Sequence, residues 1–228
     1  RDVRIAMNLA MDRDEINELV YDGLMTPRQA SPNSMSPEYH EGAATAYAYY
    51  APDEANALLD QAGYAERDAE GFRLWDDGSG EPISFIIEGF RVEGSPEVDA
   101  VLMVCKYLEE VGIKATYKSE ERALYEERRQ ANLVDAAWYT VGHFALVMLV
   151  HHNYYVGQLV DRPWAGGWGL WALDPNDPNG HPPPDGHFLW RMWEIWDRAL
   201  IEPDPQKRIA LNLEILDIWA EEVPVVGI

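Results

Sequence analysis

Residues 3–17 read VRIAMNLAMDRDEIN, and this stretch predicts two consecutive helices separated by a capping residue. Its first half repeats apolar side chains at helical spacing, namely Val3, Ala6, Met7 and Ala10. Asp12 has the side chain of an N-cap, and Glu15 stands three positions later, where a capping box places an acid. The sequence therefore predicts a helix over residues 2–11 and a second helix that ends at Gly23.

The size and charge of the chain limit the kinds of partner that it can have. Its 228 residues are 47% apolar, which is enough for one large domain or two small ones with a sizeable core. The net charge is −22, from 40 acidic and 18 basic residues. Nucleic acid and anionic lipid both attract basic surfaces, so this balance argues against both partners and favours a solvated acidic surface.

Cys105 is the only cysteine and stands within an apolar helical pattern, which excludes a disulfide framework and indicates a small buried side chain. No stretch reaches the roughly 18 unbroken apolar residues of a membrane-spanning helix. No secretory signal opens the sequence, so for an exported protein we expect any targeting segment to have preceded Arg1.

Strand and helix patterns alternate along most of the chain. Apolar and β-branched runs predict strands over residues 83–88, 113–118, 135–141 and 223–228. Helical patterns cover residues 52–62, 96–110, 120–131, 144–158, 187–201 and 204–221. Residues 26–51 and 161–187 are rich in turn-forming residues and are expected to be irregular. We therefore expect an α/β fold with a mixed, mostly parallel sheet flanked by helices.

The expected sheet directs attention to the ends of its strands, because ligands bind beyond the carboxyl ends of parallel strands. This rule selects Phe90 and Arg91 after the first predicted strand, and His143 and Phe144 after the third. Trp138 lies within the third strand and alternates with its apolar neighbours, so a position in the core and contact with a ligand both stay open. These five residues are candidates for contact with a ligand.

The chain contains nine Trp, more than a core needs, because each buried indole N–H must find a partner. Three of them, Trp164, Trp168 and Trp171, lie in the Gly- and Pro-rich segment 161–187 and are expected to form a wall beside the strand ends. For Trp168 and Trp171, both stacking on a ligand and packing under the loop stay open. Three others at helical spacing are expected in the core: Trp190, Trp193 and Trp196.

No metal site or cofactor site is predicted. His151 and His152 are adjacent and cannot both face one site on a helix. His181 and His187 lack the spacing of a zinc signature.

Four blocks resemble one family, the family 5 extracellular solute-binding proteins of ABC importers, which includes dipeptide, oligopeptide and nickel binders. The opening stretch resembles the family's "vRqAlalAiDRdei" block. YAPDEANALLDQAGY (residues 50–64) resembles "ydpekAkaLLdeAGy", and YLEEVGIKA (residues 107–115) resembles "qLkkiGIkv". Residues 205–224 resemble the closing helix, so the blocks stand in family order over nearly the whole chain.

The resemblance implies a lobe of the type II periplasmic-binding-protein fold. It also implies that residues 1–228 form the C-terminal lobe, because in that family an N-terminal lobe precedes the opening block. Members of the family close two lobes around a solute and deliver it to a membrane permease. The expected partners are therefore a solute, an ABC permease and an N-terminal lobe, and the expected location is extracytoplasmic, in the periplasm or as a cell-surface lipoprotein.

Two departures within the resemblance concern the solute. Peptide-binding members place an acid just past the third strand, where it pairs with the α-amino group, but residues 138–145 contain no acid. WAGGWGLW (residues 164–171), followed by residues 180–184, resembles the "WglWw.t.G..GeePP" segment of a subgroup in which some members take up oligosaccharides. We therefore expect an oligosaccharide or a similar polar solute, with an oligopeptide as the other class.

A carbohydrate-active enzyme such as a glycoside hydrolase is the alternative from a different functional class. Such an enzyme pairs two carboxylates, and acids are plentiful here because of the overall composition. None of them stands in a recognisable catalytic frame, and no G-x-S-x-G nucleophile motif occurs. The sequence therefore predicts a binding protein without catalytic residues.

Overall fold

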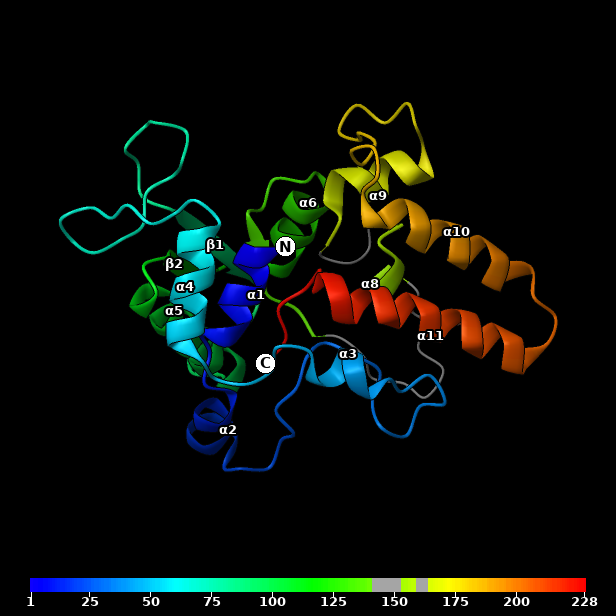
Figure 1. Ribbon diagram of the computed structural model, residues 1–228, viewed down its shortest axis with the longest axis horizontal. Helices are drawn as coiled ribbons and strands as arrows, with labels where there is room; N and C mark the ends of the chain where they lie inside the picture. Colours follow the sequence, from blue (N-terminus) through cyan, green and yellow to red (C-terminus); the bar gives the residue numbers. More distant parts are fainter. Residues whose placement is uncertain (141–152, 159–163) are drawn as a thin grey trace.

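The computed structural model describes residues 1–140, 153–158 and 164–228 (Figure 1). Its helices are α1 (Asp2–Leu9), α2 (Arg13–Tyr21), α3 (Glu41–Thr45), α4 (Pro52–Gln61), α5 (Pro96–Glu110), α6 (Arg122–Gln130), α8 (Asn153–Val156), α9 (Gly166–Leu173), α10 (Phe188–Ile201) and α11 (Pro205–Glu222). Its strands are β1 (Ser84–Gly89), β2 (Lys114–Ser119) and β3 (Ala136–Ala137). Among the helices that the structure describes, none is both long enough and apolar enough to span a bilayer.

β1 is the central strand of a three-stranded sheet in which both described pairings are parallel. It pairs with β2 along its whole length and with β3 at two positions. The prediction of a mostly parallel sheet flanked by helices is therefore confirmed. The predicted strand 135–141 is shorter than expected, since regular pairing covers only Ala136 and Ala137, and residue 141 lies outside the described residues.

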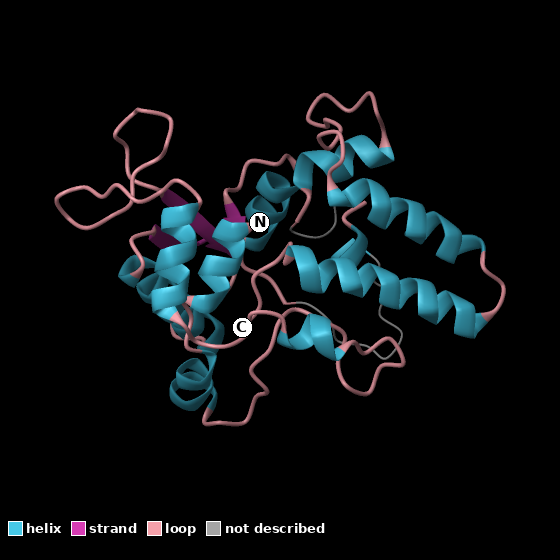
Figure 2. Ribbon diagram, in the orientation of Figure 1, coloured by secondary structure: helices cyan, strands magenta, loops and turns pink. Residues whose placement is uncertain are grey.

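A first hydrophobic core lies between the sheet and helices α1, α4 and α5 (Figure 2). Its members include Leu9, Leu59, Ile83, Ile87 and Leu108, all buried. Because side chains alternate along a strand, Ile83 and Ile87 point to the same face of the sheet and meet the helices there. The face of the sheet that carries Ile83 and Ile87 is therefore covered by helices, and the opposite face is left for other contacts.

The opening helix pair forms as the sequence predicts. The Asp12 carboxylate caps α2 by accepting a hydrogen bond from the Glu15 N–H at 2.9 Å. At the other end of α2, Asp22 takes the left-handed C-cap conformation with φ 54°, and Gly23 follows with φ 70°. The helix therefore ends at Tyr21, and Gly23 is the residue after the C-cap, as the sequence predicts.

A second hydrophobic core lies between α10 and α11, with α3, α8 and α9 beside them. Trp193, Trp196 and Trp219 are buried in it. The indole N–H groups of Trp193 and Trp219 donate to backbone carbonyls of α8 at 2.8 and 2.7 Å, which satisfies the polar atom of each ring. Trp190 is 37% exposed, so the prediction of a core position is confirmed for Trp193 and Trp196 and wrong for Trp190.

A buried hydrogen-bond network connects the opening helices to the end of the chain. The Arg13 guanidinium donates to the Gly227 carbonyl at 2.7 and 2.9 Å and to the backbone and side-chain oxygens of Asn8 at 2.8 and 2.7 Å. Gln29 donates to the Asn8 side chain at 2.6 Å and accepts from the Gly227 N–H at 2.9 Å. We call these four residues the Arg13 network. Burial lowers the pKa of Arg13 to about 10.

Residues 223–228 form no strand, contrary to the sequence prediction. Val223 has φ 44° as the C-cap of α11, which turns the chain away from the helix axis. Its carbonyl accepts from the Arg4 side chain at 2.9 Å, and the Gly227 backbone is bound by the Arg13 network. Arginine and glutamine side chains therefore bind backbone N–H and C=O groups that would otherwise pair with a neighbouring strand.

Two segments that were expected to be irregular contain helices. The segment 26–51 holds α3, whose first turn is capped because His40 Nδ1 accepts from the Ala43 N–H at 2.9 Å. The segment 161–187 holds α9, which packs its aromatic residues against the second core. In α3 a side-chain cap and packing, and in α9 packing without a side-chain cap, outweigh the low helix propensity of glycine and proline nearby.

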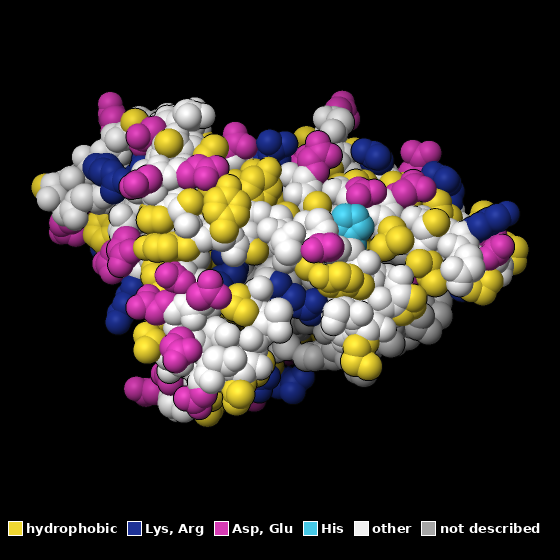
Figure 3. All heavy atoms as spheres, turned by 60° about the horizontal axis from the view of Figure 1, so that its bottom comes forward, with side chains coloured by type: hydrophobic (Ala, Val, Ile, Leu, Met, Phe, Trp, Pro, Cys, Tyr) yellow, Lys and Arg dark blue, Asp and Glu magenta, His cyan; other side chains and the backbone are white. Residues whose placement is uncertain are grey.

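The surface carries the acidic excess without gathering it into one region of the visible face. Figure 3 shows acidic side chains spread over that face, with fewer Lys and Arg between them. This distribution follows from 40 acidic and 18 basic residues in the sequence. The few basic clusters therefore stand out as local exceptions in a negative surface.

Candidate functional site

The carboxyl end of β1 leads directly into Phe90 and Arg91. Gly89 is required there, because a Cβ at this position would lie 2.8 Å from the Tyr117 hydroxyl and 3.3 Å from Trp138 Cβ. The Tyr117 and Ser119 hydroxyls donate to the Arg91 carbonyl at 3.2 and 2.7 Å. Side chains from the end of β2 thus fix the loop that follows β1.

The Phe90 ring is the centre of an aromatic and cationic cluster. Its centroid lies 5.4 Å from that of Tyr125 and 5.7 Å from that of Tyr139. The guanidinium carbons of Arg91 and Arg122 lie over the ring, 5.1 and 4.9 Å from its centroid. We call Phe90, Arg91 and Arg122 the Arg–Phe–Arg cluster; in it two cations each contact one aromatic ring that follows the central strand.

Charges beside this cluster are mostly paired. The Glu88 carboxylate is buried and accepts two hydrogen bonds from Arg128, both at 2.8 Å. This bidentate contact holds the pKa of Glu88 below its ordinary value, against the opposing effect of burial. Glu120, also buried, forms an ion pair with Lys118 and lies 3.7 Å from Arg128.

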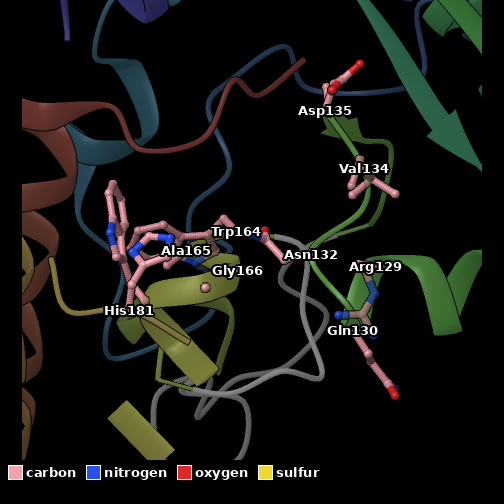
Figure 4. A pocket seen from close by; sticks show the side chains of 13 residues that line it. Arg129, Gln130, Asn132, Val134, Asp135, Trp164, Ala165, Gly166 and His181 are labelled. Atoms are coloured by element: carbon pink, nitrogen blue, oxygen red, sulfur yellow. The ribbon is translucent and has the colours of Figure 1, made fainter. Parts of the chain in front are cut away.

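A cavity of about 340 Å³ lies between the segment that joins α6 to β3 and the first turn of α9. Figure 4 shows Trp164, Gly166 and His181 on one side of it and Arg129 and Asn132 on the other. Asp135, Ala136 and Ala137 complete the wall formed by the strand. We call this cavity the Trp pocket.

Residues outside the Trp pocket hold its aromatic side chains in place. The Trp164 indole N–H donates to the Tyr154 carbonyl at 2.7 Å, and its ring meets Trp219 edge-on at 5.5 Å. The Trp168 ring lies 4.5 Å from His187 and 6.3 Å from His181, measured between centroids. Burial lowers the pKa of His187, which favours a neutral imidazole against the tryptophan.

Two glycines at the start of α9 make room for the other wall of the pocket. A Cβ at Gly166 would overlap the side-chain oxygen of Asn132, and a Cβ at Gly167 would lie 2.8 Å from His181 Nε2. The glycines therefore allow an amide and an imidazole to approach the helix backbone. With Asp135 and Arg129, these groups give the pocket hydrogen-bonding partners around an aromatic surface.

The structure places the predicted site residues in two neighbouring regions. Phe90 and Arg91 lie at the end of β1, and Trp138 follows β3, where its N–H donates to the Glu88 carbonyl at 2.8 Å. Trp164 and Trp168 line the Trp pocket, which borders the segment leading into β3. The remaining predictions have other outcomes: His143 and Phe144 lie outside the described residues, and Trp171 packs edge-on against Trp190 at 5.5 Å.

Sequence reasoning did not select Arg122, Asn132 or His181. Arg122 begins a strongly charged helix, so it reads as a solvated residue. Asn132 lies in the short connection between α6 and β3. Its φ of 56° is a backbone conformation that Asn adopts more readily than most residues. Within the described part of the chain, no group of three or more His, Cys, Asp or Glu is arranged to hold a metal ion.

A family model described as "Bacterial extracellular solute-binding proteins, family 5 Middle" matches residues 1–148. Among solved structures, the chain is similar to an oligopeptide-binding protein, OppA, with 32% identity and a TM-score of 0.86; the match covers 99% of this chain and 37% of that one. None of the curated proteins matches the chain.

Two more distant structures share the fold. A mannohexaose-bound periplasmic oligopeptide-binding protein of an ABC transporter from Thermotoga maritima has 18% identity and a TM-score of 0.72, over 99% of this chain and 40% of that one. NikA from Brucella suis, solved with Fe(III)-EDTA, has 19% identity and a TM-score of 0.71, over 99% and 41%. The chain thus spans well under half the length of these three structures.

Proposed function

The chain belongs to family 5 of the bacterial extracellular solute-binding proteins, and we propose that it forms one lobe of a receptor for an ABC importer. The receptor would capture a solute outside the cytoplasm by lobe closure and present it to a membrane permease. The α/β lobe with a parallel central sheet supports this proposal, as does the likeness to OppA over 99% of the chain. No covalent chemistry belongs to this function.

We assign residues 1–228 to the C-terminal lobe of that receptor. The order of the sequence blocks supports the assignment, and so does the 37% of the OppA chain that the match covers. An N-terminal lobe would supply the opposite wall of the solute site. For this reason we expect residues 1–228 alone to bind the solute weakly.

The preferred solute is an oligosaccharide, and the Trp pocket is the observation that carries this choice. Sugars present C–H faces that pack on aromatic rings, and their hydroxyls need hydrogen-bonding partners around the edge. Trp164 and Trp168 offer the rings, while Asn132, Asp135 and His181 offer the polar atoms. The mannohexaose bound to the Thermotoga maritima relative gives this class of solute a precedent within the fold.

An oligopeptide is the second candidate, because the 32% identical structure is named an oligopeptide-binding protein. The sequence of residues 138–145 argues against it, since no carboxylate is available there for the α-amino group of a peptide. An unpaired ammonium group in a closed site would lose part of its solvation without compensation. Peptides are therefore included in the test as the competing class.

Isothermal titration of the full-length protein separates these solutes. Mannohexaose and cellohexaose are expected to release heat on binding, and trialanine is not. Trp168→Ala is expected to weaken oligosaccharide binding roughly tenfold or more, because the ring face is lost. Trp75→Ala is the matched control, since Trp75 is 42% exposed and lies between α4 and β1, outside the Trp pocket.

Heat evolved only with trialanine would overturn the choice of an oligosaccharide. The glycoside hydrolase alternative is tested in the same samples by chromatography after incubation. Intact mannohexaose supports a binding protein, whereas shorter products would favour the hydrolase.

A further inference from the structure

We propose that His187 positions the Trp168 ring for the solute and releases that ring when its own imidazole is protonated. The proposal rests on the function proposed above, because Trp168 is a ring that we expect to stack on a sugar. It adds a dependence on pH to the capture of the solute. His187 is a positioning residue, since it lies outside the Trp pocket and acts through Trp168.

The start of α10 fixes the His187 side chain in its neutral form. His187 is the N-cap of that helix, and its Nδ1 accepts a hydrogen bond from the Leu189 N–H at 3.3 Å. Nδ1 accepts only while it carries no proton, so the proton of the neutral ring lies on Nε2. The His187 N–H donates to the Pro184 carbonyl at 3.0 Å, and its carbonyl accepts from the Trp190 N–H at 3.1 Å. The imidazole can therefore turn while the backbone stays in place.

Two aromatic rings lie against this imidazole. The centroid of the imidazole is 4.5 Å from that of Trp168 and 4.3 Å from that of Phe188. Phe188 in turn stacks on Trp164, with centroids 6.5 Å apart and ring planes 10° apart. His187 therefore supports one aromatic ring of the Trp pocket directly and the other through Phe188.

His187 also lines a second cavity, which has a volume of about 230 Å³. This cavity lies between the first turn of α10 and the last turn of α11. Its wall includes Arg191, Glu221 and Glu222, and it does not include Trp168. The cavity therefore gives a charged imidazole a place beside two acidic residues and away from the tryptophan.

Charges on several elements decide when the imidazole is protonated. Burial, and after it Arg4 of α1, lower the pKa of His187 below its ordinary value of 6.5, while Glu222 opposes them. In the part of the chain that the structure describes, the charged groups that face His187 are the α-amino group of Arg1, Arg4, Arg191, Glu221 and Glu222. The imidazole is therefore neutral at pH 7.5 and becomes half protonated at a pH below 6.5.

Protonation sets two hydrogen-bond donors against each other. The Nδ1–H of the imidazolium would face the Leu189 N–H at the positive end of α10, so the cap is lost. Attraction to the face of Trp168 favours the charged ring where it is, but the second cavity offers two carboxylates instead. We therefore expect the charged imidazole to turn toward Glu221 and Glu222. Trp168 then loses its support, which weakens its stacking on a sugar.

Fluorine NMR of the full-length protein, labelled with 5-fluorotryptophan, tests the positioning without a solute. The Trp168 resonance is identified by its absence from Trp168→Phe. It is expected to shift as the pH falls from 7.5 to 5.0, with a midpoint below pH 6.5, and to stay constant in His187→Asn. Asparagine also caps helices but does not titrate.

His40→Asn is the matched control for this measurement. His40 caps α3 through its Nδ1, as His187 caps α10, and lies outside both cavities. The Trp168 resonance of His40→Asn is expected to titrate as it does in the unmodified protein.

Isothermal titration with mannohexaose, which is uncharged at every pH used, measures the consequence for binding. Between pH 7.5 and 5.0 the affinity of the unmodified protein is expected to fall by up to roughly tenfold, the loss expected for Trp168→Ala. His187→Phe keeps a ring beside Trp168 but has no ionisable group there. Its affinity is expected to change by less than about twofold over the same range.

Three results would overturn the positioning role. The first is a Trp168 resonance that does not move in the unmodified protein. The second is a shift that persists in His187→Asn and disappears in His181→Gln, since His181 lies 6.3 Å from Trp168 between ring centroids. The third is an affinity of His187→Phe that still falls with pH. If mannohexaose releases no heat at any pH, the proposed solute fails, and the fluorine signal alone decides whether His187 positions Trp168.

Discussion

Trp168 and Trp171 stand three positions apart, and the structure gives them different surroundings. Trp168 lines the Trp pocket and contacts His187, whereas Trp171 meets Trp190 edge-on at 5.5 Å. The two interpretations that the sequence leaves open therefore apply to different residues. Ligand stacking stays a hypothesis for Trp168, and packing describes Trp171.

Cys105 provides a prediction about reactivity. It lies in the first core, and burial raises the pKa of its thiol to about 11 from an ordinary value of 9.0. The thiolate fraction near pH 8 is then roughly a hundredfold below that of an unfolded chain. We expect iodoacetamide to leave the native protein unmodified at pH 8 and to label it in urea, as measured by intact mass. Rapid labelling without urea would contradict a buried thiol.

The close approach of Gly166 and Asn132 provides a second prediction. Gly166→Ala introduces a Cβ where the Asn132 oxygen lies, so we expect a loss of about 1–3 kcal/mol in the free energy of unfolding. Asn132→Gly/Gly166→Ala should recover most of the loss, because glycine tolerates the φ of 56° at position 132. Urea denaturation of the single and double variants measures this. A double variant no more stable than Gly166→Ala would show that the contact is not the cause.

The sequence predicts some site residues well and others not at all. Phe90 and Arg91 follow from one rule, that ligands bind beyond the carboxyl ends of parallel strands, and the structure puts both there. Arg122 does not follow from any local pattern, since a charged helix usually faces water. Its place over Phe90 depends on how α6 crosses from β2 to β3, which is a tertiary property.

At the scale of elements, the Glu88–Arg128 pair joins β1 to α6. Glu88→Gln keeps the shape of the side chain but removes its charge. We therefore expect the free energy of unfolding at pH 7 to fall by about 2 kcal/mol, a moderate value because Arg128 is partly exposed to solvent. Urea midpoints give this value. Glu194→Gln, at an exposed position on α10, is the control and should change little.

The same pair has a pH dependence whose sign follows from Glu88. Its pKa is lower in the folded protein than the ordinary 4.5, mainly because of the hydrogen bonds from Arg128. The pair therefore stabilises the fold above about pH 4.5, and this stabilisation is lost as the pH falls toward the folded value. We expect the free energy of unfolding to fall less steeply below pH 4.5 in Glu88→Gln than in the unmodified protein. Parallel acid profiles of the two proteins would contradict this contribution.

The elements that the sequence mispredicts share a physical cause. Gly166, Gly167 and Gly169 argue against a helix, yet α9 forms because Trp168 and Trp171 pack on the second core. Residues 223–228 are apolar and β-branched, yet they pair with side chains and not with a strand. In both segments tertiary contacts override local propensity, which a single sequence does not display.

At the scale of the whole molecule, the two hydrophobic cores meet near the Arg13 network. Val226 packs on the first core and Val225 on the second, beside Gly227 of the network. The composition allows one large domain or two small ones. The structure has features of both, because it contains two hydrophobic cores that one hydrogen-bond network connects. The fold class was predictable because strands and helices alternate; the division of the core was not.

Arg13→Met tests whether the network couples the two cores. Methionine fills similar space but leaves the Gly227 carbonyl and the Asn8 side chain without their donor, at a cost of about 3 kcal/mol. Far-UV circular dichroism reports both cores, while Trp fluorescence mostly reports the second, which buries Trp193, Trp196 and Trp219. We expect the two unfolding curves to coincide in the unmodified protein and to separate in Arg13→Met.

Arg198→Met, on the exposed face of α10, is the control and should keep the curves together. Coincident curves in Arg13→Met, with a lower midpoint, would show that other contacts couple the cores.

The contact between Arg13 and Gly227 also sets an order of events during protein synthesis. The two residues are 214 positions apart, and Arg4 reaches Val223 across 219 positions. A ribosome makes both arginines long before their acceptors emerge, at about 5–20 residues per second. For the intervening ten seconds or more, α1 and α2 lack the carbonyl acceptors that their arginines bind in the folded lobe, so the Arg13 network can close only after residue 227 has been made.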